Sequence, residues 1–66
     1  MDTAFLRRGF NLSQKYVSKQ LGISIPTLKK KEDGTLDYTK TEMLKLTELY
    51  KQHDSSLTVD KIFFAD

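Results

Sequence analysis

Lysine and arginine are concentrated in the first half of this sequence, where no acidic side chain opposes them. Residues 3 to 31 contain seven basic residues and no Asp or Glu, whereas residues 32 to 66 contain four lysines and eight acids. The seven are Arg7, Arg8, Lys15, Lys19, Lys29, Lys30 and Lys31. A stretch that carries only positive charge is typical of a surface that binds a polyanion. We favour this interpretation over the alternative, a surface that only keeps the protein in solution.

Other chemistry has little support in the residue types. The segment His53-Asp54-Ser55-Ser56 contains the side chains of a hydrolase triad, but adjacent residues in a linker cannot adopt triad geometry. A metal site lacks ligands, because the chain has one His, no Cys and only scattered acids. The three glycines are too widely spaced for a phosphate-binding loop. We therefore expect no enzymatic activity, no metal and no other cofactor.

The length of 66 residues limits the chain to one domain, residues 1–66, with a small core. Without cysteine there is no disulfide to stabilise it, so its stability must come from well-packed elements, aided by self-association. The sequence has neither a basic-then-apolar leader nor a run of 18 apolar residues. We expect a soluble cytoplasmic protein that does not enter a membrane.

Capping residues and apolar spacing predict two helices in the region that carries Arg7 to Lys19. Asp2 or Thr3 can cap a first helix that ends near Arg8, with Gly9 in the left-handed position after its end. Ser13 is a good N-cap for a second helix, which Gly22 ends. The apolar stripe predicted for the second helix consists of Tyr16, Val17 and Leu21.

The three consecutive lysines fall on a third predicted helix. Ser24 is its N-cap, Pro26 lies in its first turn, where a missing N–H costs nothing, and the helix runs to about Glu32. Gly34 then takes the position after its end. Glycine and proline therefore begin and end this helix and do not interrupt it.

Two further elements are predicted after the basic region. Residues 39 to 42 match a capping box and open a fourth helix. Its apolar face consists of Met43, Leu46, Leu49 and Tyr50. Residues 57 to 64 fit either a last short helix or an edge strand, because Val, Ile and Phe also favour strands.

The stretch LSQKYVSKQLGISIPTLKKKEDG, residues 12 to 34, resembles the helix-turn-helix unit of Cro/cI-type regulators, also called the XRE family. The matching positions are Leu12-Ser13-Gln14, Ser18, Leu21 to Ser24, Thr27-Leu28 and Glu32-Asp33-Gly34. The leucine-rich helix and the short last helix of the family match later segments, so the resemblance covers about residues 5 to 64. Lys31 departs from the pattern, since an apolar residue is usual there.

The resemblance implies an all-α fold, a compact five-helix, lambda-repressor-like domain with its helix-turn-helix at about residues 13–32. It also implies a regulator of phage or mobile-element type that binds a roughly palindromic operator in double-stranded DNA as a homodimer. Such a protein represses or modulates transcription. Any dimer would use the same small body, and we expect the last two helices to form its interface.

A helical wheel sorts the residues of the third helix by direction. With Leu28 in the core, Pro26 and Lys30 fall about 160° and 200° away and point outward. Thr27 and Lys29 flank them, whereas Lys31 lies about 60° from the core direction and must extend along its apolar stem. We expect Lys29 and Lys30 to face a DNA groove and Lys31 to be structural or a peripheral phosphate contact.

A helix-turn-helix places the start of its second helix at the base edges, which here means Ser24, Ile25, Pro26 and Thr27. This leading edge suits thymine methyl groups but offers few hydrogen bonds to bases, while Lys30 can reach guanine O6 and N7. By the resemblance, Gln14 contacts the DNA backbone. Lys15, Lys19 and Arg7 or Arg8 would add affinity that depends on salt.

Three alternatives remain open. A modulator of the same fold would act by binding another repressor protein, and the apolar leading edge and the acidic second half favour it. Its protein interface would include Phe63 and an outward Phe64, unless this end of the chain only frays. A winged-helix excisionase-like protein is the second alternative, although the spacing of Glu32 and Gly34 argues against it. The third is the antitoxin of a toxin–antitoxin pair.

Overall fold

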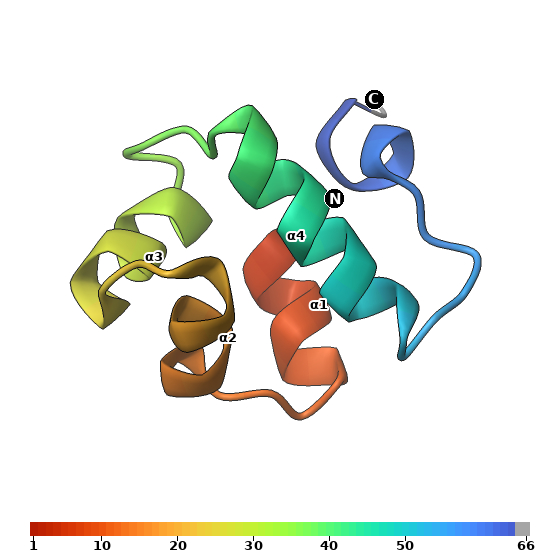
Figure 1. Cartoon of the computed structure of the whole chain (residues 1–66), viewed down its shortest axis with the longest axis horizontal. Coiled ribbons are helices and arrows are strands. Elements are labelled where there is room, and N and C mark those ends of the chain that lie inside the picture. Colours follow the sequence, from red (N-terminus) through yellow and green to blue (C-terminus); the bar gives the residue numbers. More distant parts are fainter. Residues whose placement is uncertain (65–66) are drawn as a thin grey trace.

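The computed structural model describes residues 1–64, and every regular element within them is helical, which confirms the all-α prediction. The elements are α1 (Thr3–Gly9), α2 (Gln14–Leu21), α3 (Ile25–Glu32), α4 (Lys40–Lys51) and the π-helical turn η1 (Asp60–Phe64). Figure 1 shows α4 crossing the middle of the molecule, with α2 and α3 on one side of it and η1 on the other. The element α3 and the turn η1 therefore lie on opposite sides of α4.

The helices begin where the capping residues predict. Asp2 Oδ1 accepts hydrogen bonds from the backbone N–H groups of Ala4 and Phe5. The Ser13 and Ser24 hydroxyls cap α2 and α3 in the same way, and Thr39 forms a full capping box with Glu42. These bonds satisfy backbone donors that a helix start leaves without partners.

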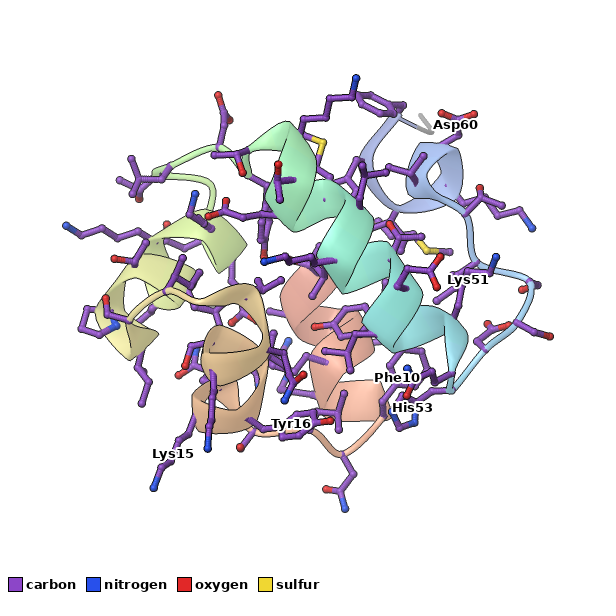
Figure 2. The ribbon with its side chains drawn as sticks, in the orientation of Figure 1. Phe10, Lys15, Tyr16, Lys51, His53 and Asp60 are labelled. Atoms are coloured by element: carbon purple, nitrogen blue, oxygen red, sulfur yellow. The ribbon has the colours of Figure 1, made fainter. Side chains whose placement is uncertain are left out.

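The end of α1 differs from the prediction. Gly9 is the last helical residue, Phe10 caps the helix, and Asn11 takes the left-handed conformation with φ 61°. Asn tolerates this conformation better than most residues. The one-residue extension turns Phe10 inward, where its ring meets Tyr50 edge-on at 5.4 Å and stacks on His53 at 5.0 Å (Figure 2).

Residues 59 to 64 are helical and residues 57 and 58 lead into them without a strand, so the strand alternative for this segment is wrong. The Thr58 hydroxyl accepts from the N–H of Lys61 at the start of the turn. Leu57 and Ile62 are fully buried, and the ammonium group of Met1 donates to the Ile62 carbonyl at 2.8 Å. Burial of Leu57 and Ile62 therefore fixes this segment, and strand pairing does not.

The hydrophobic core of the described residues lies between α4 and the other helices. Its buried apolar side chains are Val17, Leu21, Leu28, Leu46, Leu49, Tyr50, Leu57 and Ile62. Tyr16 is not among them, contrary to the predicted stripe, because its side chain is 43% exposed. Residues 33 to 39 form turns and loop without a strand, so within residues 1–64 there is no hairpin to serve as the wing of a winged-helix protein.

Candidate nucleic-acid interface

The turn between α2 and α3 fixes the two helices as a pair. Gly22 takes the left-handed conformation at φ 72°, and its N–H and that of Ile23 bond to carbonyls in the last turn of α2. Leu28 of α3 has no exposed surface and packs in the core with Leu21 of α2. The opposite face of α3 is therefore turned away from the body of the protein.

That outer face carries most of the residues expected to touch DNA. Ile25 is 41% exposed, and Pro26, Lys29 and Lys30 are also exposed. Ser24 is exposed and Thr27 is half-buried. Ser24 donates to the Thr27 hydroxyl at 2.8 Å and accepts the Thr27 N–H at 3.2 Å, so its hydroxyl is used within the cap.

A buried ion pair joins α1 to the end of α3. Arg7 Nε donates to Glu32 Oε2 at 2.7 Å, and the other carboxylate oxygen accepts from Arg7 at 3.3 Å and from Gln14 Nε2 at 3.0 Å. A further guanidinium nitrogen donates to the Leu12 carbonyl at 3.0 Å. Of the two arginines expected to add affinity, Arg7 is only 9% exposed, whereas Arg8 is exposed. We call Arg7, Glu32 and Gln14 the hub.

The hub also orients the side chain of Gln14. One N–H of its amide is held by Glu32, so Glu32 fixes the direction of the side chain at the start of α2. A primary amide has a second N–H and a carbonyl oxygen that remain for other contacts. Gln14 is half-buried and adjoins the exposed Lys15, so it stands at the edge of the cationic surface.

Lys31 is structural, as its place on the wheel predicts. Its ammonium group bonds to Glu42 Oε1 at 2.7 Å and to the Asp37 carbonyl at 2.9 Å, and it lies 5.8 Å from the centre of the Tyr38 ring. Burial raises the pKa of the Glu42 carboxyl, but hydrogen bonds from Lys31 and the Thr39 backbone outweigh it and hold that pKa below its ordinary value. This pair fastens the loop between α3 and α4.

The two ion pairs redistribute the charge of the first half. Within residues 1–64 they are the only salt bridges, and each joins a first-half cation to a second-half acid. The other five first-half cations are exposed: Arg8, Lys15, Lys19, Lys29 and Lys30. They all belong to α1, α2 and α3, and Figure 2 shows Lys15 extending away from the body.

Acidic side chains border this surface at the end of α3. Hydrogen bonds from Thr35 lower the pKa of the Asp33 carboxyl, and the nearby charges of Lys29 and Lys30 lower it further. A shallow cavity of about 220 Å³ beside it is lined by Asp2, Ala4, Arg7, Arg8, Gln14, Lys29, Glu32 and Asp33. Its three carboxylates make it unsuitable for a phosphate. The cationic surface therefore ends at the C-terminus of α3.

Apolar side chains form a second surface at the other end of the molecule. Phe64 is 63% exposed, whereas Phe63 is half-buried and meets Tyr38 edge-on at 5.3 Å. A groove of about 320 Å³ is lined by Lys40, Met43, Leu44, Val59 and Phe64. We call it the α4–η1 groove. Phe64 lines it, and Phe63 is held against the core.

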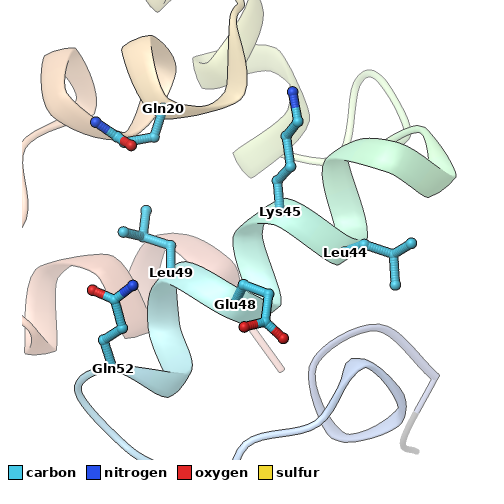
Figure 3. Close-up of a pocket in the computed structure, with 6 residues that line it drawn as sticks. All are labelled: Gln20, Leu44, Lys45, Glu48, Leu49 and Gln52. Atoms are coloured by element: carbon cyan, nitrogen blue, oxygen red, sulfur yellow. The ribbon is translucent and has the colours of Figure 1, made fainter.

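Leu44 separates this groove from a more polar one on the same helix. Figure 3 shows that second pocket, lined by Gln20, Leu44, Lys45, Glu48, Leu49 and Gln52. Leu44 was not among the predicted surface residues, although its spacing from Leu46 and Leu49 places it off the core face. Glu32 was not predicted as the partner of Arg7 either, because only the folded chain brings these residues together.

The part of the chain that the structure describes, residues 1–64, carries neither a membrane-spanning helix nor a cluster of metal ligands. No helix there is both long and apolar enough to span a bilayer. No cluster of three or more His, Cys, Asp or Glu residues there is arranged to hold a metal ion. Comparison with family models, with curated proteins and with solved structures gave no match for this chain. The assignment of a function therefore depends on the residues and their geometry.

Proposed function

We propose that the protein is a sequence-selective DNA-binding regulator of transcription that inserts α3 into the major groove of an operator. One observation carries the proposal. Folding neutralises two of the first-half cations with acids from the second half and leaves five exposed on the three helices around the α2–α3 turn. The major groove of B-DNA is wide enough for one helix, and the phosphates on either side attract such cations.

The exposed residues divide into two roles. Lys15 and Lys19 on α2 and Arg8 on α1 would bind phosphates, which gives affinity but no sequence information. Gln14, oriented by Glu32, would contact the backbone beside them. Ser24, Ile25, Pro26, Thr27, Lys29 and Lys30 on α3 would face the bases. Lys30 is the residue that can hydrogen-bond to guanine.

A palindromic operator requires two copies, and the α4–η1 groove is suited to joining them. In a two-fold interface the same contact occurs twice. If a residue of the first copy contacts a given residue of the second, the same residue of the second copy contacts that residue of the first. Lys40 on one wall and Asp60 on η1 have opposite charges, so a second copy can place its Asp60 beside Lys40 while Phe64 and Leu44 are covered. We therefore propose a homodimer through α4 and η1.

The spacing of recognition helices restricts this dimer. Half-sites one turn apart require each α3 to lie about 17 Å from the two-fold axis. The longest extent of the chain is 28 Å, and α3 and η1 lie on opposite sides of α4 (Figure 1). A dimer through α4 and η1 must therefore keep each α3 at about 17 Å from the two-fold axis.

The test is a titration of the pure protein against random duplex DNA and against duplexes selected from the same pool. The proposal predicts selective binding that Lys30→Ala strongly weakens, with helicity unchanged because Lys30 is exposed. A protein that binds every duplex equally, or none, would sink the proposal.

A modulator that binds another repressor is the second candidate. Its support is the exposed Phe64 beside an apolar groove, together with the scarcity of hydrogen-bonding groups at the start of α3. It predicts no selective DNA binding and a stable complex with a second regulator that Phe64→Ser disrupts. The same titration therefore separates the two candidates.

A further inference from the structure

Resting on the proposed function, we infer that the leading edge of α3 selects DNA by the 5-methyl groups of pyrimidines. The ligand class is thymine in the major groove, read by Ile25 and Pro26. This inference goes beyond the proposal that the protein binds DNA, because it names the chemical group that is recognised and the side chains that recognise it.

The apolar character of this edge is the first support. Ile25 is 41% exposed and Pro26 is exposed, although both are near the start of a helix whose Leu28 is completely buried. Ile25 could have been expected in the core, about 60° from Leu28 on the wheel. The fold instead leaves Ile25 partly exposed next to the outward Pro26, so the start of α3 presents an apolar surface.

The polar groups beside it are already engaged. The Ser24 hydroxyl donates its proton to Thr27 Oγ1 and accepts the Thr27 N–H, so the Ser24 side chain completes its bonds within the cap. Thr27 keeps one hydroxyl proton, and it is half-buried. The pairs that distinguish bases by two hydrogen bonds need Arg, Lys, Asn or Gln, and residues 24–27 contain none of these.

The surrounding charge identifies the occupant. Lys29 and Lys30 follow the apolar edge on α3, and both are exposed. An apolar surface with exposed cations on the same helix complements a groove that presents methyl groups between two rows of phosphates. An acidic protein segment carries negative charge as DNA does. Binding of such a segment is therefore one of the outcomes that the test distinguishes.

Uracil provides a direct test, because it differs from thymine only by the missing methyl group. A duplex selected from a random pool is resynthesised with each thymine replaced in turn by uracil, and its Kd is measured at one salt concentration. We expect about fourfold weaker binding for each lost methyl that Ile25 or Pro26 covers, from the usual value of one buried CH₂ or CH₃ group. Uracil elsewhere in the duplex should have no effect.

Protein variants assign the effect to these side chains. Ile25→Ser should remove the difference between thymine and uracil at its position, and Pro26→Ala tests the second contact. Both residues are exposed, and helicity by circular dichroism checks folding. Lys30→Ala is the matched control, because it should weaken binding to the thymine and the uracil duplex by the same factor.

The contrary results are distinguishable. If uracil changes Kd by less than about 1.5-fold at every position while Lys30→Ala still abolishes selectivity, the thymine inference is overturned and the proposed function stands. A Kd that Ile25→Ser leaves unchanged for both duplexes overturns it too. If no duplex is selected, or an acidic protein competes away all DNA, both the inference and the proposed function are wrong.

Discussion

At the residue scale, Arg7 and Arg8 show how neighbours of the same type take different roles. Arg7 is buried and bound to Glu32, whereas Arg8 is exposed. The two cannot be told apart by composition or local pattern, because Glu32 lies 25 residues further along the chain. Lys31 is different. It follows Leu28 by three residues on the same helix, and this spacing is enough to predict that Lys31 does not face a DNA groove.

Glu32→Gln tests the hub. The substitution removes the negative charge and leaves Arg7 buried without a counter-ion, which typically costs about 3 kcal/mol. Urea unfolding should therefore show a large loss of stability. Glu48→Gln on the exposed side of α4 is the matched control, with an expected change within about 0.5 kcal/mol. Equal effects of the two substitutions would contradict a structural role for the hub.

Lys31 and Glu42 make stability depend on pH. The folded pKa of Glu42 lies below its ordinary value of 4.5, so its contribution to stability is present above pH 4.5 and is lost as the pH falls through the folded pKa. Glu42→Gln should flatten the fall in the unfolding free energy below that pH. An unchanged pH profile in this variant would show that the Lys31 bond contributes nothing.

At the element scale, the starts of helices were predictable and one end was not. Ser13, Ser24 and Thr39 cap their helices through bonds that span three residues, so the signal is entirely local. The end of α1 depends on Phe10 reaching Tyr50 in α4, which no local pattern contains. The ambiguity of residues 57–64 has the same origin, because burial of Ile62 decides it.

Gly22→Ala tests the turn that sets α3 against α2. Its φ of 72° is strained for an L side chain, and an added Cβ would meet no atom within 4 Å, so the cost is purely conformational. We expect a loss of about 1 kcal/mol in urea unfolding. Gly9→Ala is the matched control, since Gly9 is helical with no positive φ and should gain about 0.5 kcal/mol. A neutral Gly22→Ala would contradict the account of the turn.

At the scale of the whole molecule, folding separates two surfaces that the sequence only partly indicates. The excess of cations in residues 3–31 was visible directly, but its division into five exposed and two engaged side chains needed the fold. The α4–η1 groove is lined by residues from two segments that are about 20 residues apart in the sequence, such as Met43 and Phe64. No periodicity in either segment predicts the hollow between them.

The homodimer is tested by Leu44→Asp and Phe64→Ser. Each puts a polar group into the groove that a second copy would cover, so sedimentation should show a dimer in the unaltered protein and a shift toward monomer in both variants. Phe5→Ser is the control, because Phe5 is a comparably exposed aromatic residue on α1. A monomer at every concentration, or a dimer that only Phe5→Ser weakens, would refute this interface.

The salt dependence of DNA binding tests the central claim most directly. For a selected duplex, the slope of log K against log salt falls by about 0.9 for each lost phosphate contact. Lys15→Ala on α2 should lower the slope by this amount, whereas Lys51→Ala at the end of α4 should leave it unchanged (Figure 2). Equal slopes for the two variants, or a larger change for Lys51→Ala, would contradict DNA binding by the surface around α3.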